Sequence, residues 1–143
     1  MKIRFLNGAI LSAALLCIVP PAMAGGEEGY GDEGCTPGYW KQPQHFDSWV
    51  GYSPDDDYCD TFGLTTCPEQ LVDLTLLDAL RQGGGGWAAL GRHSVAALLS
   101  AKSLDYPYSK WDVLTMVSAA DLFGVETTKD LLDEANNLGC PLN

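Results

Sequence analysis

The chain is strongly acidic: its 143 residues include 8 Lys and Arg against 19 Asp and Glu, a formal net charge of −11 at pH 7. Binding to nucleic acid or to an anionic membrane surface depends on Lys and Arg, so this composition argues against both kinds of partner. The length fits one small domain, and acidity of this degree is typical of a protein that its charge keeps in solution.

The first 24 residues have the parts of a secretory signal peptide. Lys2 and Arg4 form a basic start, residues 9–19 form a short apolar run, and an A-x-A pattern ends at Ala24. Cleavage after Ala24 removes 24 of the 143 residues and leaves 119, and the loss of Lys2 and Arg4 changes the net charge from −11 to −13. We expect a secreted protein, extracellular or periplasmic. No later apolar run approaches the roughly 20 residues of a membrane-spanning helix, so we expect no stable membrane insertion.

Residues 25–34 are rich in glycine and acidic side chains, which predicts a flexible lead-in to a single domain over residues 35–143. Residues 35–67 contain several Gly and Pro and many aromatic side chains, but they show no helical or alternating period. We expect this segment to form an irregular cap with a short helical turn near residues 42–49. Buried aromatic rings would then supply the packing that regular structure supplies elsewhere.

Four cysteines remain after the signal peptide: Cys35, Cys59, Cys67 and Cys140. An even number in a small exported chain is typical of two disulfides, and four cysteines allow three pairings. These cysteines lack the C-x-x-C spacing of a structural zinc site, so metal binding is the weaker interpretation. Among the pairings we favour Cys59 with Cys67 as a local loop and Cys35 with Cys140 as a clasp across the domain.

Residues 68–143 have the pattern of helices. Pro68 stands where a first helical residue is favoured, and leucines then recur at every third position until the Gly83–Gly86 run ends the pattern. From Trp87 to about Lys102 the chain is apolar on nearly every side, which predicts a helix in the middle of a bundle.

Two further helices are predicted from capping boxes, in which Ser or Thr precedes an acidic residue by three positions. Ser109 with Asp112 would start the third helix, and Thr127 with Asp130 would start the fourth, with Gly139 at its C′ position. The expected inner faces carry, in the third helix, Trp111, Leu114, Val117 and Leu122, and, in the fourth, Leu131, Ala135 and Leu138. The sequence therefore predicts an all-α fold: a small four-helix domain with an irregular, aromatic-rich, disulfide-bonded N-terminal cap.

Several motifs occur in an order that resembles a group of secreted bacterial proteins with the C-T-P-G-[YF]-W-K motif. In chain order these motifs are Cys35–Lys41, Gly83–Gly86, Leu90–Leu99, Lys129–Asn137 and Gly139–Leu142. The resemblance covers most of residues 35–142. It implies secretion, and it supports pairing the two cysteines that lie inside shared motifs, at positions 35 and 140. It implies no activity and no catalytic residue.

Tyr39, Trp40, His45 and Trp49 form the candidate binding site of the cap. Aromatic rings with polar tips suit half-exposed sites, so these residues would stack on the rings of a carbohydrate. The alternative, which we favour, is that the same rings fill the core of the cap, because a domain this small needs bulky side chains inside.

Asp55, Asp57 and Asp60 belong to the densest group of carboxylates and are the candidate metal ligands. Ca²⁺ takes about 6–8 oxygen ligands, and clustered carboxylates in one loop can supply several of them. The spacing does not match an EF-hand loop, because Asp60 stands where that loop needs Gly and Thr66 where it needs Glu. A solvated acidic loop is the favoured interpretation, and calcium is the cofactor to test.

Arg92 and His93 form a polar pair inside an otherwise apolar segment. We expect both to be buried and to bond loop carbonyls or an aspartate. The alternative is an enzyme in which His93 or His45 performs acid–base work, since histidine titrates near neutral pH. Such an enzyme would need a nucleophile beside the histidine, and neither G-x-S-x-G nor H-E-x-x-H occurs in the sequence.

Three classes of function are consistent with these features. The favoured one is a secreted, noncatalytic extracellular or cell-surface domain of structural or interaction type, with self-association as its expected behaviour. The first alternative is a small module that binds carbohydrate or calcium. The second is a hydrolase-like enzyme that uses His93 or His45.

Overall fold

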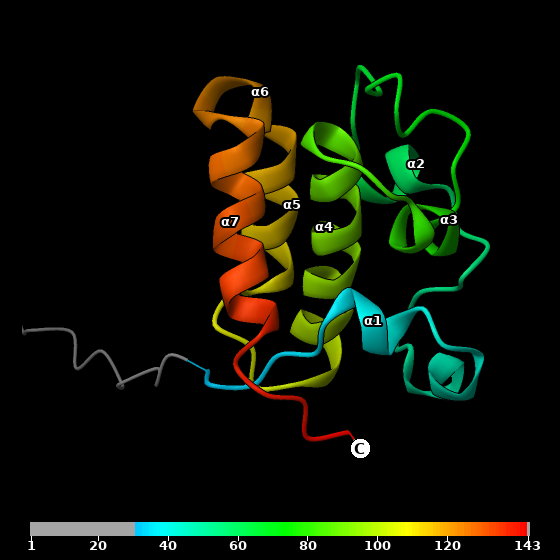
Figure 1. Ribbon diagram of the computed structural model, residues 1–143, viewed down its shortest axis with the longest axis vertical. Helices are drawn as coiled ribbons and strands as arrows, with labels where there is room; N and C mark the ends of the chain where they lie inside the picture. The colour runs from blue at the N-terminus through cyan, green and yellow to red at the C-terminus, as the bar shows by residue number, and fades with distance from the viewer. Residues whose placement is uncertain (1–30, 143) are drawn as a thin grey trace, which may run out of the picture.

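Helix α4 (Gly86–Ser103) lies in the middle of the helices of the computed structural model (Figure 1). Helices α5 (Lys110–Ser118) and α7 (Val125–Asn136) pack on one side of it, and α1 (Pro37–Trp40) and α3 (Leu76–Arg81) pack on the other. Buried residues follow one another along α4 on every face. The prediction of a central helix that is apolar on nearly every side is therefore confirmed.

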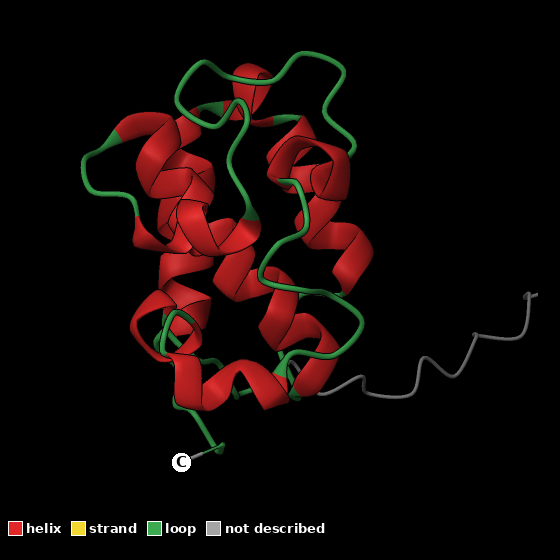
Figure 2. Cartoon of the chain, turned by 90° about the vertical axis from the view of Figure 1, so that its right-hand side faces the viewer, coloured by secondary structure: helices red, strands yellow, loops and turns green. Residues whose placement is uncertain are grey.

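Within residues 31–142, the part of the chain that the structure describes, there are eight helical segments and no β-strand (Figure 2). The all-α class is therefore confirmed, and α3, α4, α5 and α7 correspond to the four predicted helices. The other segments are short: α1, the 3₁₀ helix η1 (Pro43–Ser48), α2 (Tyr58–Phe62) and α6 (Ala120–Phe123). The predicted turn near residues 42–49 is η1. None of these helices is long and apolar enough to cross a membrane.

The first predicted helix begins at Leu76 and not at Pro68. Thr75 is its N-cap: Thr75 Oγ1 accepts a hydrogen bond from Asp78 N, and the Asp78 carboxylate accepts one from Thr75 N. Asp73 has a φ of 58°, which lies in the left-handed region that a right-handed helix excludes. The residues between Pro68 and Thr75 therefore form turns, and the helix starts only at this capping box.

The leucines of this segment are still core residues, although they do not share one helix. Leu71 is fully buried in the turns and packs against Gly91 of α4. A Cβ atom at Gly91 would lie 2.5 Å from Leu71 Cδ2, so the absence of a side chain allows this close approach. The spacing of three thus identified buried positions but not the start of the helix.

The third predicted helix starts as expected and ends early. Ser109 Oγ accepts a hydrogen bond from Asp112 N, and the Asp112 carboxylate accepts one from Ser109 N, which confirms the capping box. Helix α5 stops at Ser118, and the chain turns at Ala119 before α6 begins. Residues beyond Ser118 therefore do not continue the face that α5 presents to the core.

The predicted inner face of this helix is correct for Leu114 and Val117 but wrong for Trp111 and Leu122. Val117 is buried and Leu114 is partly buried, whereas Trp111 is 71% exposed and Leu122 is 85% exposed. The buried face of α5 carries Val113 and Val117, which are four positions apart and therefore neighbours on the helix surface. Trp111 lies beside that face, and the turn after α5 removes Leu122 from it.

The predicted capping box of Thr127 with Asp130 is also wrong. Helix α7 begins at Val125, and its N-cap is Gly124, which has no side chain to cap it. Thr128 Oγ1 instead donates a hydrogen bond to Gly124 O at 3.0 Å inside the first turn. The helix therefore starts before the Ser/Thr signal that sequence reasoning used.

The predicted inner stripe of α7 is correct for Ala135 but wrong for Leu131 and Leu138. Leu132 is fully buried, whereas Leu131 is exposed. Ala135 is buried as predicted, and Leu138 is exposed because it lies beyond the end of the helix. Two adjacent leucines satisfy a helical period equally well, so the pattern alone could not choose between them.

The two ends of the domain meet at a pair of glycines. Gly34 N donates a hydrogen bond to Gly139 O at 2.9 Å, and the two residues form an antiparallel bridge. A Cβ atom on Gly34 would lie 2.0 Å from Ala135 O, so only glycine fits there. Gly139 has a φ of 134°, but α7 ends at Asn136, so Gly139 does not occupy the predicted C′ position.

The domain begins earlier than predicted. Glu33 N donates a hydrogen bond to Asp105 O at 3.0 Å, and Asp105 N donates one to Glu33 Oε2 at 2.9 Å. Residues 31–34 are therefore part of the domain and not of a flexible lead-in. The predicted signal peptide, residues 1–24, and residues 25–30 lie outside the described residues.

Two disulfides join Cys35 to Cys140 and Cys59 to Cys67, which confirms the favoured pairing. The first links residues 105 positions apart and the second residues 8 positions apart. The long link closes the whole domain, and the short one closes the loop that follows α2.

Removing the long disulfide is expected to destabilise the protein more than removing the short one. On the loop-entropy model, Cys35→Ala with Cys140→Ala costs about 4–5 kcal/mol, and Cys59→Ala with Cys67→Ala costs about 2–3 kcal/mol. Urea unfolding followed by far-UV circular dichroism measures both free energies. Equal losses in the two variants would contradict the assignment of the long link as the main constraint on the unfolded chain.

Candidate functional site

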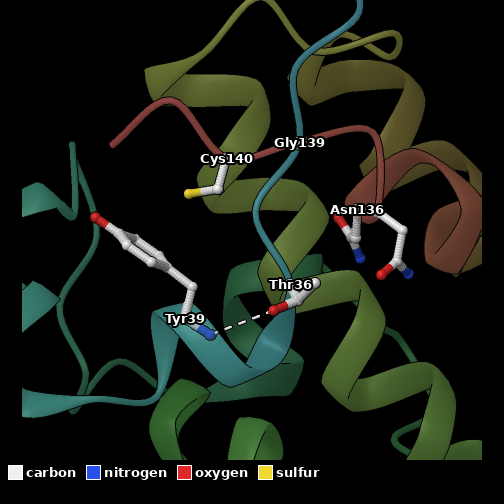
Figure 3. Close-up of a pocket in the computed structure, with 7 residues that line it drawn as sticks. Thr36, Tyr39, Asn136, Gly139 and Cys140 are labelled. Atoms are coloured by element: carbon white, nitrogen blue, oxygen red, sulfur yellow. Dashed lines mark hydrogen bonds between the residues drawn. The ribbon is translucent and has the colours of Figure 1, made fainter. Parts of the chain in front are cut away.

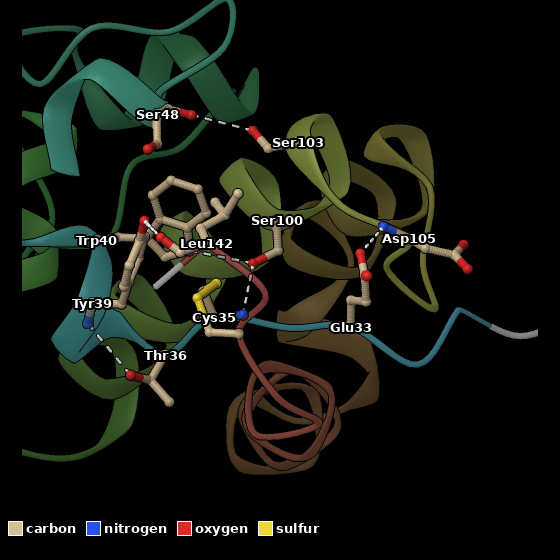
Figure 4. The surroundings of a disulfide bond; sticks show 11 residues. Glu33, Cys35, Thr36, Tyr39, Trp40, Ser48, Ser100, Ser103, Asp105 and Leu142 are labelled. Atoms are coloured by element: carbon tan, nitrogen blue, oxygen red, sulfur yellow. Dashed lines mark hydrogen bonds between the residues drawn. A yellow bond between two sulfur atoms is a disulfide. The ribbon is translucent and has the colours of Figure 1, made fainter.

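Buried serine hydroxyls of α4 attach the aromatic cap: Ser94 Oγ lies 2.8 Å from the hydroxyl of Tyr58, and Ser100 holds the start of the cap. Thr36 caps α1, whose short turn directs Trp40 inward, where its side chain is fully buried. Ser100 Oγ accepts a hydrogen bond from Trp40 Nε1 and another from Cys35 N, both at 3.3 Å (Figure 4). One serine of the central helix therefore binds both the indole of Trp40 and the backbone of the disulfide-bonded Cys35.

The other rings of the predicted binding site are held in the same way. Trp49 is buried and donates from Nε1 to Trp40 O at 3.3 Å, and Tyr39 is buried and donates from its hydroxyl to Leu142 O at 3.1 Å. His45 is partly exposed and stacks on Tyr39, with ring centroids 3.8 Å apart. Three of the four candidate binding residues are thus core residues, in agreement with the favoured interpretation that the rings fill the cap.

A small pocket lies where the chain ends meet, beside the long disulfide (Figure 3). Its volume is about 200 Å³, and its lining residues are Gly34, Thr36, Tyr39, Asn136, Asn137, Gly139 and Cys140. Thr36 Oγ1 already accepts a hydrogen bond from Tyr39 N. Pockets that hold small molecules usually measure about 300–1,000 Å³, so this hollow is a packing feature of the clasp.

The acidic loop does not gather into a metal site. Asp57 is the N-cap of α2, and its Oδ1 accepts a hydrogen bond from Asp60 N at 2.8 Å. Asp55 is exposed, and Asp56 Oδ2 accepts a hydrogen bond from Ser53 N. Among residues 31–142 no three His, Cys, Asp or Glu side chains are grouped as they would be around a metal ion. The residues predicted as calcium ligands shape the start of α2.

Arg92 and His93 are partly buried rather than fully buried, and each has its own partner. Arg92 Nη1 donates to the loop carbonyl Gln82 O at 2.8 Å. His93 Nδ1 lies 3.4 Å from Asp133 Oδ1 of α7, without the geometry of a hydrogen bond. The expected contacts with a loop carbonyl and an aspartate are therefore present. Both side chains tie α4 to neighbouring segments.

The environment of His93 favours its neutral form. Burial lowers the pKa of His93 from its ordinary value of 6.5, and the charges of Arg92 and Lys129 lower it further. Asp133 and Asp130 act in the opposite direction but do not outweigh the loss of hydration. Nδ1 of His93 is buried and forms no hydrogen bond within the described residues, so Asp133 is its neighbour only through charge.

A groove that sequence reasoning missed lies between α5 and the loop after α2. Two hollows of about 340 and 270 Å³ have Gly63 and Ser118 in common and are together called the α5 groove. Its other lining residues are Asp60, Thr61, Phe62, Leu64, Thr65, Thr66, Trp87, Trp111, Leu114, Thr115, Val117 and Asp121. The sequence carried a signal for only one wall, the three threonines inside the Cys59–Cys67 loop, which no motif singled out.

A second surface feature is the apolar end of α6. Leu122 and Phe123 follow each other in the chain and are 85% and 75% exposed. Helix α6 forms the turn between α5 and α7, at the opposite end of these helices from the chain ends (Figure 1). Sequence reasoning placed Leu122 inside a longer helix and therefore missed this pair.

Comparison with protein-family models, with curated proteins and with solved structures finds no match to this chain. The resemblance to the secreted bacterial group therefore remains a prediction, and the site is interpreted from its own geometry.

Replacing Ser100 is expected to destabilise the cap. The Ser100→Ala variant leaves two buried N–H groups without an acceptor, which costs about 2–3 kcal/mol of unfolding free energy. Ser103→Ala on the same helix removes one long hydrogen bond, to Ser48 O at 3.4 Å, and serves as the matched control, with an expected cost below about 1 kcal/mol. Urea unfolding measures both. Equal small losses would show that Ser100 does not anchor the cap.

The lowered pKa of His93 predicts a loss of stability in mild acid. The unfolded chain takes up a proton near the ordinary pKa of 6.5, before the folded chain does, so His93 stabilises the fold above that pH. This contribution is lost as the pH falls through the pKa of the folded state. Unfolding free energies at about pH 7.5 and about pH 5.5 should therefore differ more in the wild type than in His93→Gln. An equally steep fall in His93→Gln would refute the assignment.

Proposed function

We propose that the chain is a secreted, noncatalytic domain of structural or interaction type that self-associates through helix α6. The observation that carries this proposal is the exposure of two adjacent large apolar side chains, Leu122 at 85% and Phe123 at 75%. Single exposed apolar residues are common, whereas two large ones at adjacent positions of a short helix offer a candidate contact surface.

The disulfides support a location outside the cytosol. Disulfides persist in oxidising compartments, and both pairs of this chain are formed. The predicted signal peptide of residues 1–24 points to the same compartment. Together these features favour an extracellular or cell-surface domain.

The noncatalytic assignment is supported by what the polar side chains of the interior do. Arg92 holds a loop carbonyl, His93 faces Asp133, and Asn136 links the two long helices by donating from Nδ2 to His93 O. Tyr106 donates from its hydroxyl to Asn136 Oδ1, which completes a structural chain of contacts. These groups are engaged in holding helices together.

A second copy of the chain is a suitable occupant for the α6 surface. A two-fold contact requires a patch that is complementary to itself, and two-fold dimers are the commonest homo-oligomers. A Leu beside a Phe meets this requirement, because the Phe of each copy can cover the Leu of the other. Asp121 and Glu126 flank the pair and are exposed, so like charges would approach each other across the contact. Salt should therefore strengthen this association by screening the repulsion.

The double variant Leu122→Ser with Phe123→Ser tests this proposal. Sedimentation velocity over a series of protein and salt concentrations should show association of the wild-type protein that grows with salt. The double variant should associate at least about tenfold more weakly, because the buried apolar area is lost.

Val50→Ser with Val72→Ser is the matched control, since these two side chains are also exposed and apolar but lie elsewhere. The control should associate as the wild type does. A wild-type protein that stays monomeric across the whole series, or a double variant that associates normally, would refute self-association through α6.

A further inference from the structure

The α5 groove has the composition of a carbohydrate site, which the aromatic cap lacks. A sugar ring presents hydroxyl groups around its edge and an apolar face of C–H groups. A site for it needs an accessible aromatic ring beside donors and acceptors of hydrogen bonds. The groove supplies both kinds of surface. A ligand site here would be separate from the self-association surface of the proposed function.

The aromatic surface comes from Trp111. Its side chain is 71% exposed, in contrast to Trp40 and Trp49, which are buried in the cap. Lys110 Nζ lies 4.8 Å from the centroid of the Trp111 ring, which places a cation over one of its faces. This contact orients the indole, and the exposure of the ring leaves room for a ligand on the other face.

A second tryptophan lines the other half of the groove. Trp87 is partly buried and lies with Val117 and Leu64 in the hollow that adjoins the one containing Trp111. The two hollows have Gly63 and Ser118 in common. From Trp111 to Ser118 the helix rises about 10 Å, which exceeds the width of one sugar ring and suits a short chain of them.

The polar groups of the groove are hydroxyls and carboxylates. The hydroxyls belong to Thr61, Thr65, Thr66, Thr115 and Ser118, and the carboxylates to Asp60 and Asp121. Hydroxyls both donate and accept hydrogen bonds, and an ionised carboxylate accepts them. This set matches the hydroxyl groups of a neutral sugar. The carboxylates would repel a phosphate, a sulfate or an acidic sugar.

The short disulfide fixes the wall of the groove opposite α5. The lining residues from Asp60 to Thr66 all lie within the loop that Cys59–Cys67 closes. A wall that is already ordered costs less to hold in place when a ligand binds. The short disulfide therefore orders a wall of the groove in addition to stabilising the fold.

We propose that the α5 groove binds a short, neutral oligosaccharide, with Trp111 as the stacking ring and Asp60 and Asp121 as acceptors for sugar hydroxyls. Leu122 and Phe123 do not line the groove, although the neighbouring Asp121 does, so the α6 pair and Trp111 can be substituted separately. The two proposals can therefore fail independently.

The test uses isothermal titration calorimetry and tryptophan fluorescence on the mature protein. The probes are neutral tetrasaccharides of glucose, N-acetylglucosamine, mannose and galactose, with an oligogalacturonate as the acidic comparison. At least one neutral probe should bind and change the fluorescence, and the acidic one should not bind. Trp111→Ala should weaken that binding at least about tenfold, and Asp60→Asn should weaken it less.

The matched control is Val50→Ala, which shortens another exposed apolar side chain outside both the groove and the α6 surface and should bind the probe as the wild type does. Circular dichroism and the melting temperature verify that Trp111→Ala is folded, as expected for so exposed a side chain. No binding of any neutral probe, preferential binding of the acidic one, or unchanged binding by Trp111→Ala would each overturn the proposal.

Discussion

The hydroxyl of Ser100 fixes the first segment of the cap to the central helix, next to the disulfide that closes the domain. It accepts hydrogen bonds from the backbone at Cys35 and from the indole of Trp40, so it brings the first disulfide cysteine and the first tryptophan of the cap onto the central helix. An indole N–H that is taken out of water needs an acceptor, and this one lies on the most buried element of the fold. Because the acceptor is inside, the ring must point inward.

This constraint has a direct consequence for function. Trp49 donates to the carbonyl of Trp40, and Tyr39 donates to the carbonyl of Leu142, so these two rings are oriented by Trp40 and by the C-terminal segment. Tyr39, Trp40 and Trp49, in and near the Cys35–Lys41 motif, are therefore buried in the core. A ligand surface must come from side chains that this network leaves outside, and Trp111 is the tryptophan most exposed among the described residues.

The sequence predicted the disulfides, the central helix and one capping box. It did not predict which side chains of α5 and α7 face the core. Both disulfides, the central helix and the box of Ser109 with Asp112 follow from cysteine number, continuous apolarity and capping. The inner faces of α5 and α7 did not follow, because Leu131 and Leu132 fit the same period and because the turn at Ala119 resets the phase before Leu122. The α5 groove was hidden for another reason: its hydroxyl residues are far apart in the sequence and meet only when the loop packs beside the helix.

The two disulfides therefore have different roles in the same domain. The long one joins the two ends of the domain. Two other contacts already hold this region: the hydrogen bond to Ser100 and the bridge between Gly34 and Gly139. Its effect falls mainly on the unfolded state, since it shortens the loop that must close. The short one closes so few residues that it constrains the unfolded chain less, yet it holds the loop that forms one wall of the groove. The short disulfide therefore adds stability and also orders the wall of the groove that faces α5.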